Sequence, residues 1–231
     1  MEKTYEYRNP EDSHGTRPNF AHSFDAQGTV ISRMKQIIRK SIIALREQLP
    51  PDTRAAHSAA ITERLLQLPE YRQAVVVLGY MNIGAEFASE IWINQVLADG
   101  KKLALPRVNR HTNQLDLYWV DDPENQLAPG LWGIREPVVE RCERVATLNE
   151  VEFALLPGVA FTRDGARLGY GGGFYDKLLA HFREQNGTHR PALVAAAFAL
   201  QIVEQIPQEE TDIKVEWIVT EHETIKCSSP E

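Results

Sequence analysis

The most prominent candidate for chemistry is a glycine-rich segment at residues 164–176, which reads Asp-Gly-Ala-Arg-Leu-Gly-Tyr-Gly-Gly-Gly-Phe-Tyr-Asp. Four of the five residues from Gly169 to Gly173 are glycine, which leaves backbone N–H groups unshielded and permits left-handed turns. A helix is expected directly afterwards, and exposed amides followed by a helix N-terminus suit the phosphates of a nucleotide. The segment matches neither G-x-x-x-x-G-K-[ST] nor G-x-G-x-x-G. A structural strand-to-helix turn, with Asp176 complementing the helix dipole, is the alternative.

Three cations share one face of the first predicted helix. Lys35, Arg39 and Arg46 are spaced i, i+4 and i+11, so at about 100° per residue they lie within about 40° of one another. Like charges at i, i+4 repel, and cations near a helix start oppose the macrodipole. An anionic partner would offset this mild cost, whereas a basic face in contact with solvent is the alternative.

A third candidate is the segment from Tyr80 to Phe87, which follows a short β-branched run typical of a strand buried on both faces. In open α/β sheets, ligands bind beyond the carboxyl ends of the strands, and Glu86 lies just past such an end. Its carboxylate could accept hydrogen bonds from N–H groups of a ligand. It could equally cap the helix predicted over residues 89–98, and the residues alone leave both open.

Several familiar catalytic and metal-binding patterns are missing from the 231 residues. The seven histidines form no H-x-H or H-E-x-x-H pattern, and the two cysteines, Cys142 and Cys227, form no C-x-x-C. There is also no G-x-S-x-G nucleophile elbow. We therefore expect neither a zinc or iron site nor a serine nucleophile of that type.

The elements that must position these groups follow from the hydrophobic pattern. Ile38, Ile42, Leu45 and Leu49 recur at helical spacing. Further helices are expected over residues 52–67, 89–98 and 174–184, and strands at 74–80, 102–108, 115–120, 151–157, 193–198 and 217–220. Strands that alternate with helices of this length predict right-handed crossovers and a mostly parallel sheet. The predicted fold class is therefore α/β: a single domain whose open, mostly parallel sheet has helices on both faces, as in Rossmann-like three-layer folds.

Composition limits the remaining classes of protein. Hydrophobic residues make up 43% and charged residues 25%, which is typical of a soluble globular chain. No apolar stretch approaches the about 18 residues of a membrane span, and a net charge of −7 argues against nucleic-acid binding. Two cysteines and no signal peptide indicate the cytoplasm, and we expect a monomer. Residues 1–28 lack Ile, Leu and Val, so a disordered tail is expected before a domain over 29–231.

Taken together and in this order, these segments resemble the 5-formyltetrahydrofolate cyclo-ligase family, also called methenyltetrahydrofolate synthetases. The resemblance runs from about residue 30 to about residue 220. It rests on Lys35-x-x-x-Arg39, Met81 followed by Glu86, Trp132-Gly-Ile-Arg-Glu-Pro137, Leu156-Pro-Gly-Val-Ala-Phe161 and the glycine-rich segment that ends in Phe174-Tyr175-Asp176. It implies conversion of 5-formyltetrahydrofolate to 5,10-methenyltetrahydrofolate, with ATP cleaved to ADP and phosphate and Mg²⁺ required.

The resemblance also implies roles for individual residues. Those matching the ATP site are Lys35, Arg39, Arg167, Leu168, Gly169, Tyr170, Gly171, Gly172, Gly173, Phe174 and Tyr175. Those matching the folate site are Met81, Glu86 and Trp132, with Tyr170, Gly173 and Phe174 shared between the two sites. Glu86 would anchor the substrate through pterin N–H groups. Asp176 and Asp212 match magnesium ligands.

This chain departs from the family pattern at three positions. Tyr170 and Gly172 stand where some members carry basic residues, and Phe174 stands where tyrosine is usual. The positive charges that contact the phosphates would therefore come from the remaining cations, Lys35, Arg39 and Arg167. Two other functions remain alternatives: a sugar-phosphate isomerase or CoA-transferase relative on a similar sheet, and a non-catalytic nucleotide sensor.

Overall fold

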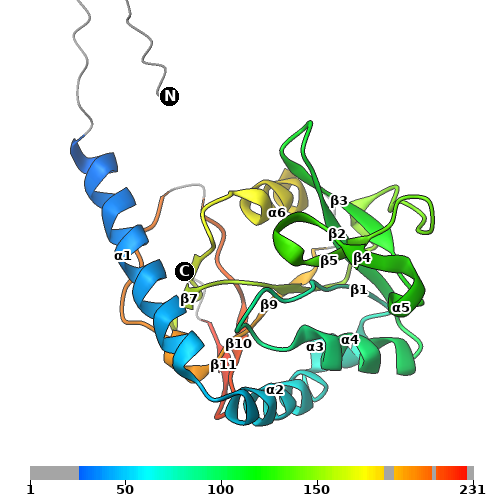
Figure 1. Ribbon diagram of the computed structural model, residues 1–231, viewed down its shortest axis with the longest axis horizontal. Coiled ribbons are helices and arrows are strands. Elements are labelled where there is room, and N and C mark those ends of the chain that lie inside the picture. Colours follow the sequence, from blue (N-terminus) through cyan, green and yellow to red (C-terminus); the bar gives the residue numbers. More distant parts are fainter. Residues whose placement is uncertain (1–25, 185–189, 210–211, 228–231) are drawn as a thin grey trace, which may run out of the picture.

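Figure 1 shows the computed structural model, which describes residues 26–184, 190–209 and 212–227. The helices are α1 (Ala26–Gln48), α2 (Pro51–Leu65), α3 (Pro69–Gln73), α4 (Ser89–Ala98), α5 (Pro123–Gln126) and α6 (Phe174–Glu184), with 3₁₀ turns η1 (Leu131–Gly133), η2 (Leu148–Glu150) and η3 (Ala199–Gln201). The strands are β1 (Val76–Leu78), β2 (Lys102–Asn109), β3 (Gln114–Trp119), β4 (Leu127–Pro129), β5 (Arg135–Pro137), β6 (Phe153–Leu156), β7 (Ala160–Phe161), β8 (Arg167–Leu168), β9 (Ala192–Ala196), β10 (Trp217–Val219) and β11 (Thr224–Lys226). Of the predicted tail, residues 1–25 lie outside the described residues, and α1 begins at Ala26.

The described strands build a seven-stranded sheet in the order β11-β10-β9-β6-β1-β2-β3. Strands β2, β1, β6, β9 and β10 run parallel to one another. At the two edges, β3 and β11 pair antiparallel with their neighbours. The prediction of an open, mostly parallel sheet is therefore confirmed.

Alternate residues of the central strand β6 point to opposite faces of the sheet, as the period of two requires. Phe153 and Leu155 belong to a core with residues of α2, α3 and α4, whereas Ala154 and Leu156 belong to a second core with residues of α6. Figure 1 shows the same three layers, with α2, α3 and α4 along one face of the sheet and α6 along the other. The prediction of helices on both faces is confirmed, and all four β6 side chains are buried.

The order of the strands reverses between β1 and β6. From β1 the chain crosses through α4 to β2 on one side, and from β6 it crosses through α6 to β9 on the other side. Such a switch point leaves a space beyond the carboxyl ends of the two strands, where open α/β sheets bind ligands. The segment after β1 carries Glu86, and the segment after β6 leads into the glycine-rich residues.

Helix α1 packs beside this switch point rather than on the main sheet. Its residues Ile38 and Ile42 share a core with Val159, Ala160 and Leu168 of the small β7–β8 hairpin. Each strand of that hairpin has two residues, too few for a readable hydrophobic period, so the sequence pattern did not predict it. The hairpin nevertheless places α1 next to the glycine-rich segment. None of the described helices is long and apolar enough to cross a membrane.

Candidate functional site

A buried polar cluster joins the segment after β1 to the glycine-rich segment. The hydroxyl of Tyr170 donates a hydrogen bond of 2.6 Å to Oε1 of Glu86 and accepts one of 2.6 Å from Nη2 of Arg46 on α1. Nη1 of Arg46 lies 3.8 Å from the same carboxylate oxygen, and the two charged side chains are 3% and 4% exposed. Three segments far apart in the sequence therefore meet at one carboxylate.

The environment of Glu86 acts on its protonation in two opposing ways. Burial raises the pKa of the carboxyl above its ordinary value, because a charge in an apolar surrounding is costly. The Tyr170 hydroxyl, the backbone N–H of Ile83 and the charge of Arg46 all act to lower that pKa. The N–H of Ile83 donates to Oε2 at 2.8 Å, inside the loop itself.

The alternative role for Glu86, as the cap of the helix over residues 89–98, is wrong. The N-cap of α4 is Ala88, and the Glu86 carboxylate accepts from Ile83 and Tyr170 instead. Ile83 belongs to the loop after β1 and Tyr170 to the glycine-rich segment, the two segments that lead away from the switch point. The geometry is therefore compatible with a carboxylate that receives N–H groups of a ligand.

The cationic face of α1 turns toward the protein and not toward solvent. Nε of Arg39 donates a 2.7 Å hydrogen bond to the carbonyl of Gly169, and Nζ of Lys35 lies 3.2 Å from Oδ2 of Asp212. The Lys35 side chain is 13% exposed and Arg46 is buried. The interpretation as a solvent-exposed basic face is therefore wrong, since the three cations contact residues of the candidate site.

The glycine-rich segment has the backbone that only glycine adopts easily. Gly171 and Gly173 have φ values of 103° and 66°, and α6 begins at the next residue, Phe174. A Cβ on Gly171 would lie 3.6 Å from the Arg39 guanidinium carbon, so the cation runs alongside this backbone. A Cβ on Gly173 would meet nothing within 4 Å. The segment therefore combines left-handed glycine backbone, free space and a helix N-terminus, the features of an anion cradle.

Replacing Gly173 with alanine is expected to weaken ATP binding without unusual loss of stability. The new methyl group would enter the proposed cradle, and the left-handed backbone would cost about 1–2 kcal/mol. Gly100→Ala is a matched control, because Gly100 has φ 72° and also has nothing within 4 Å of its Cβ position. We expect similar midpoints in chemical denaturation for the two variants, and reduced affinity in ATP titration calorimetry for Gly173→Ala alone. Equal ATP affinity in both variants would contradict a role for this backbone in binding.

Arg167 and Asp176 bracket the glycine-rich segment and contact each other. One Nη of Arg167 is hydrogen-bonded to Asp176, and the other donates to the carbonyl of Pro157 at 3.3 Å. The guanidinium also lies 6.0 Å from the centre of the Tyr175 ring. The Arg167 side chain is 3% exposed, and its buried Nε has no hydrogen-bond partner in the part of the chain that the structure describes. Arg167 thus holds the two ends of the segment together.

The two predicted metal ligands lie against cations. Asp176, 45% exposed, contacts Arg167, while Asp212 accepts from Lys35 and, at 2.9 Å, from the backbone N–H of Glu209. Among residues 26–184, 190–209 and 212–227, no group of three or more His, Cys, Asp or Glu side chains could hold a metal ion. Mg²⁺ usually binds through one or two carboxylates plus substrate phosphates and waters. The residues present fit an ion that arrives with a nucleotide, not one held in a protein cage.

The remaining predicted residues, Trp132, Met81 and Leu168, differ in exposure. Trp132 is 63% exposed, adopts φ 58°, and its ring centre lies 6.2 Å from that of Phe174. Met81 packs partly buried against the core beneath α2–α4. The side chain of Leu168 is 2% exposed in the core with α1, which gives it a packing role. Trp132 thus presents an exposed aromatic face beside the glycine-rich segment.

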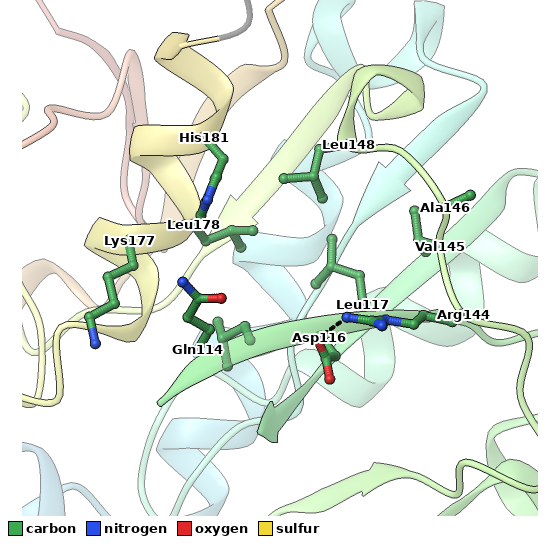
Figure 2. A pocket seen from close by; sticks show the side chains of 11 residues that line it. Gln114, Asp116, Leu117, Arg144, Val145, Ala146, Leu148, Lys177, Leu178 and His181 are labelled. Atoms are coloured by element: carbon green, nitrogen blue, oxygen red, sulfur yellow. Dashed lines mark hydrogen bonds and ion pairs between the residues drawn. The ribbon is translucent and has the colours of Figure 1, made fainter. Parts of the chain in front are cut away.

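A pocket elsewhere in the molecule has none of the predicted site residues in its lining. It has a volume of about 200 Å³ and lies between α6, β3 and residues 144–148. Figure 2 shows Lys177 and His181 from α6, the ion pair between Asp116 and Arg144, and several leucines around it. The candidate site therefore rests on the contacts at the switch point and not on this pocket.

Comparisons with known proteins agree with the arrangement of the chain. A family model described as the 5-formyltetrahydrofolate cyclo-ligase family matches residues 31–221. The 5-formyltetrahydrofolate cyclo-ligase of Haemophilus influenzae is 31% identical over 182 residues, which cover 79% of this chain and 95% of that protein. A solved structure of Aquifex aeolicus 5,10-methenyltetrahydrofolate synthetase superposes with a TM-score of 0.71 at 33% identity, covering 86% of this chain and 95% of that one. A Mycoplasma pneumoniae 5,10-methenyltetrahydrofolate synthetase, 18% identical with a TM-score of 0.62, covers 81% of this chain and 98% of its own and shares the fold.

Proposed function

The chain belongs to the 5-formyltetrahydrofolate cyclo-ligase family, and from this premise we propose that it converts 5-formyltetrahydrofolate to 5,10-methenyltetrahydrofolate while ATP is cleaved to ADP and phosphate. The observation that carries the proposal is that one segment, 167–176, contacts both the cationic helix and the buried acid. Gly169 accepts from Arg39, and the adjacent Tyr170 donates to Glu86. The cations suited to a triphosphate therefore lie next to Glu86, the carboxylate suited to the N–H donors of a pterin.

In the proposed reaction, the formyl oxygen attacks the γ-phosphorus of ATP, and ADP leaves. N5 then carries a phosphorylated imidate. N10 attacks its carbon and closes the ring, N10 loses its proton to solvent, and the departure of phosphate leaves the methenyl carbon doubly bonded to nitrogen. The protein supplies no covalent nucleophile in this scheme. Its contribution is to align the formyl oxygen with the γ-phosphate and to spread the transferred charge over fixed donors.

Each part of the site has a separate task in this scheme. Lys35, Arg39 and Arg167, with the backbone N–H groups of residues 169–173, bind and orient the phosphates. Glu86 receives the pterin N–H groups, and the ring of Trp132 stacks on the flat substrate, which its exposed aromatic face supports. Burial of Glu86 strengthens its hydrogen bonds, because the surrounding dielectric is low.

Mg²⁺ would be held by Asp176, with Asp212 as the second candidate, and when bound with the nucleotide it neutralises charge on the phosphates. The exposed carboxylate of Asp176 at the start of α6 supports this assignment.

Removal of Mg²⁺ with a chelator is expected to abolish turnover, which addition of excess Mg²⁺ should restore.

Replacing Asp176 with asparagine is expected to raise the Mg²⁺ concentration for half-maximal activity by about tenfold or more, because a ligating charge is lost. Asp52→Asn is the matched control, since Asp52 also lies in the first turn of a helix and loses the same favourable dipole interaction. The measurement is turnover against free Mg²⁺ at saturating ATP. An identical Mg²⁺ dependence in the two variants would show that Asp176 is not a ligand.

We further propose that residues 29–231 act as one catalytic domain, that the chain works as a monomer, and that it works in the cytoplasm. Cys142 and Cys227 are buried free thiols, which supports a reducing compartment. Size-exclusion chromatography with light scattering measures the oligomeric state, and a mass of twice 26.1 kDa would contradict the monomer.

The activity is tested by mixing the protein with MgATP and 5-formyltetrahydrofolate and recording the absorbance of the methenyl product. We expect absorbance only when protein, nucleotide and folate are all present, with one phosphate released per product. When the formyl oxygen is labelled with ¹⁸O, the label should appear in the released phosphate. Nucleotide binding without turnover would favour the sensor, and product formation without ATP cleavage would contradict the scheme.

A further inference from the structure

Arg46 is a buried cation with unused hydrogen-bonding capacity, next to the proposed substrate anchor. It is 3% exposed, and a guanidinium has five N–H donors. Nη2 donates to the Tyr170 hydroxyl, whereas the buried Nε and Nη1 have no hydrogen-bond partner among the described residues. Leaving such donors unpaired in the interior is costly, so a cation at this place calls for a physical reason.

Complementing the dipole of α1 does not explain the position of Arg46. The residue lies in the last turn of the helix, where a cation is favourable, but an exposed cation serves that purpose at a smaller desolvation cost. The guanidinium instead points to Tyr170 and Glu86, which come from the glycine-rich segment and the loop after β1. Its contacts therefore belong to the site.

Two neutral donors, the Tyr170 hydroxyl and the backbone N–H of Ile83, stabilise the charge of the Glu86 carboxylate, whereas burial disfavours it. Tyr80, Tyr170 and Tyr175 interact with it electrostatically, and each has a pKa raised above its ordinary value, chiefly by burial. They remain neutral at physiological pH and bring no positive charge. Arg46 is the cation that acts on Glu86 in this environment, and its charge lowers the pKa that burial raises.

We propose that Arg46 is a positioning residue for folate binding: through its hydrogen bond to the Tyr170 hydroxyl and its charge beside the carboxylate, it holds Glu86 in place for the substrate and stabilises its negative charge. The inference rests on the proposed function of Glu86 as the pterin anchor. Nε and Nη1 of Arg46 are buried, so the residue acts through Tyr170 and Glu86 and does not itself touch the ligand. In this arrangement Tyr170 links α1 to the Glu86 carboxylate, because its hydroxyl accepts a hydrogen bond from Arg46 and donates one to Glu86.

The first test follows the protonation of Glu86 in the full chain without ligands. Protein labelled with ¹³C at glutamate Cδ is titrated by NMR, and the Glu86 signal is assigned as the one lost in Glu86→Gln. Arg46→Met is expected to raise the titration midpoint of Glu86, because the neighbouring positive charge is lost, whereas Arg46→Lys should leave it close to wild type. Arg33→Met is the matched control, since Arg33 is exposed on the same helix.

The second test uses steady-state kinetics. Arg46→Met is expected to raise KM for 5-formyltetrahydrofolate by about tenfold or more, with KM for ATP changed less than about twofold. The acidic limb of kcat/KM for the folate should move to higher pH, since Glu86 with a higher pKa is ionised only above it. Arg46→Lys should restore much of the affinity and the position of the limb. In Arg46→Met combined with Tyr170→Phe, the loss should be smaller than the product of the single losses, because both variants break one chain of contacts.

An unchanged Glu86 midpoint in Arg46→Met, or equal rises of KM for both substrates, would overturn the inference. If Arg46→Met does not fold, Tyr170→Phe takes its place, because removing one hydroxyl from a side chain that is 44% exposed disturbs packing little. This variant should also raise the Glu86 midpoint and KM for the folate, and no change in either would overturn the inference. A wild-type protein that forms no methenyl product would refute the proposed function, while the NMR titration would still decide the electrostatic role of Arg46.

Discussion

Replacing Arg39 with methionine is expected to lower kcat/KM for ATP by about ten- to hundredfold, equivalent to ~1.5–3 kcal/mol for hydrogen bonds to charged groups. Arg39 donates to the carbonyl of Gly169 and runs alongside Gly171, so its loss removes a cation from the proposed phosphate cradle and a tether of the segment. KM for 5-formyltetrahydrofolate should change little, because we propose that Arg39 binds the nucleotide and not the folate. The measurement is the initial rate of methenyl formation against ATP at saturating folate.

Lys40→Met is the control for the Arg39 experiment. Lys40 is the next residue on α1 and is exposed, and its replacement by methionine removes the same single positive charge. Wild-type kinetics in Lys40→Met with a large loss in Arg39→Met would separate a specific contact from the general field of the helix. Equal losses in the two variants, or no loss in either, would contradict the assignment of Arg39.

Replacing Glu86 with glutamine is expected to lower kcat/KM for 5-formyltetrahydrofolate by about 30- to 300-fold, or ~2–3.5 kcal/mol. Glutamine has nearly the same shape but is neutral, and its NH2 group is a donor where glutamate has its second oxygen, so it cannot accept one pterin N–H on each of its two terminal atoms. KM for ATP is expected to stay within about twofold of the wild-type value, because we propose Lys35, Arg39 and Arg167, and not Glu86, as the phosphate-binding groups. Initial rates against folate at saturating ATP measure the effect.

Stability must be followed in the Glu86 experiment, because the change leaves Arg46 buried without its anionic neighbour. Breaking a buried pair from one side costs about 3–5 kcal/mol, so the variant should also unfold at a lower denaturant concentration. Glu90→Gln is the control for carboxylate loss, since Glu90 pairs with Arg135 and its side chain is 47% exposed. Folate kinetics that are the same in folded Glu86→Gln as in wild type would refute the anchor.

The fold could be predicted from the sequence where the chain is strongly patterned. The run from Phe153 to Leu156 is wholly apolar because it is buried on both faces, and such a run indicates a central strand of a parallel sheet. The hairpin β7–β8 and the edge strand β11 have two or three residues per strand. A two-residue strand has no readable period, and β11 has a single buried residue, Ile225, between two exposed polar ones. Strand β1 is equally short, but it lies in a longer apolar run that marks it in the sequence.

In the candidate site, too, the sequence predicts features within one helix but not the contacts between distant segments. The spacing of Lys35, Arg39 and Arg46 predicted a shared helix face, and the structure turns that face toward the glycine-rich segment. The sequence could not show that Arg46 reaches Glu86, because the contact joins residues that are brought together only by packing of α1 on the hairpin. The sequence comparison shows at Tyr170 only a missing basic residue, whereas the structure shows that its hydroxyl connects Arg46 to Glu86.

The most direct test of the account is a crystal structure of the protein with Mg²⁺, a non-hydrolysable ATP analogue and 5-formyltetrahydrofolate. We expect the γ-phosphate to contact Arg39, Arg167 and the backbone N–H groups of residues 169–173, with the pterin on Glu86 and the formyl oxygen next to the γ-phosphorus. A triphosphate bound away from residues 167–176, for example in the pocket between α6 and β3, would contradict the account.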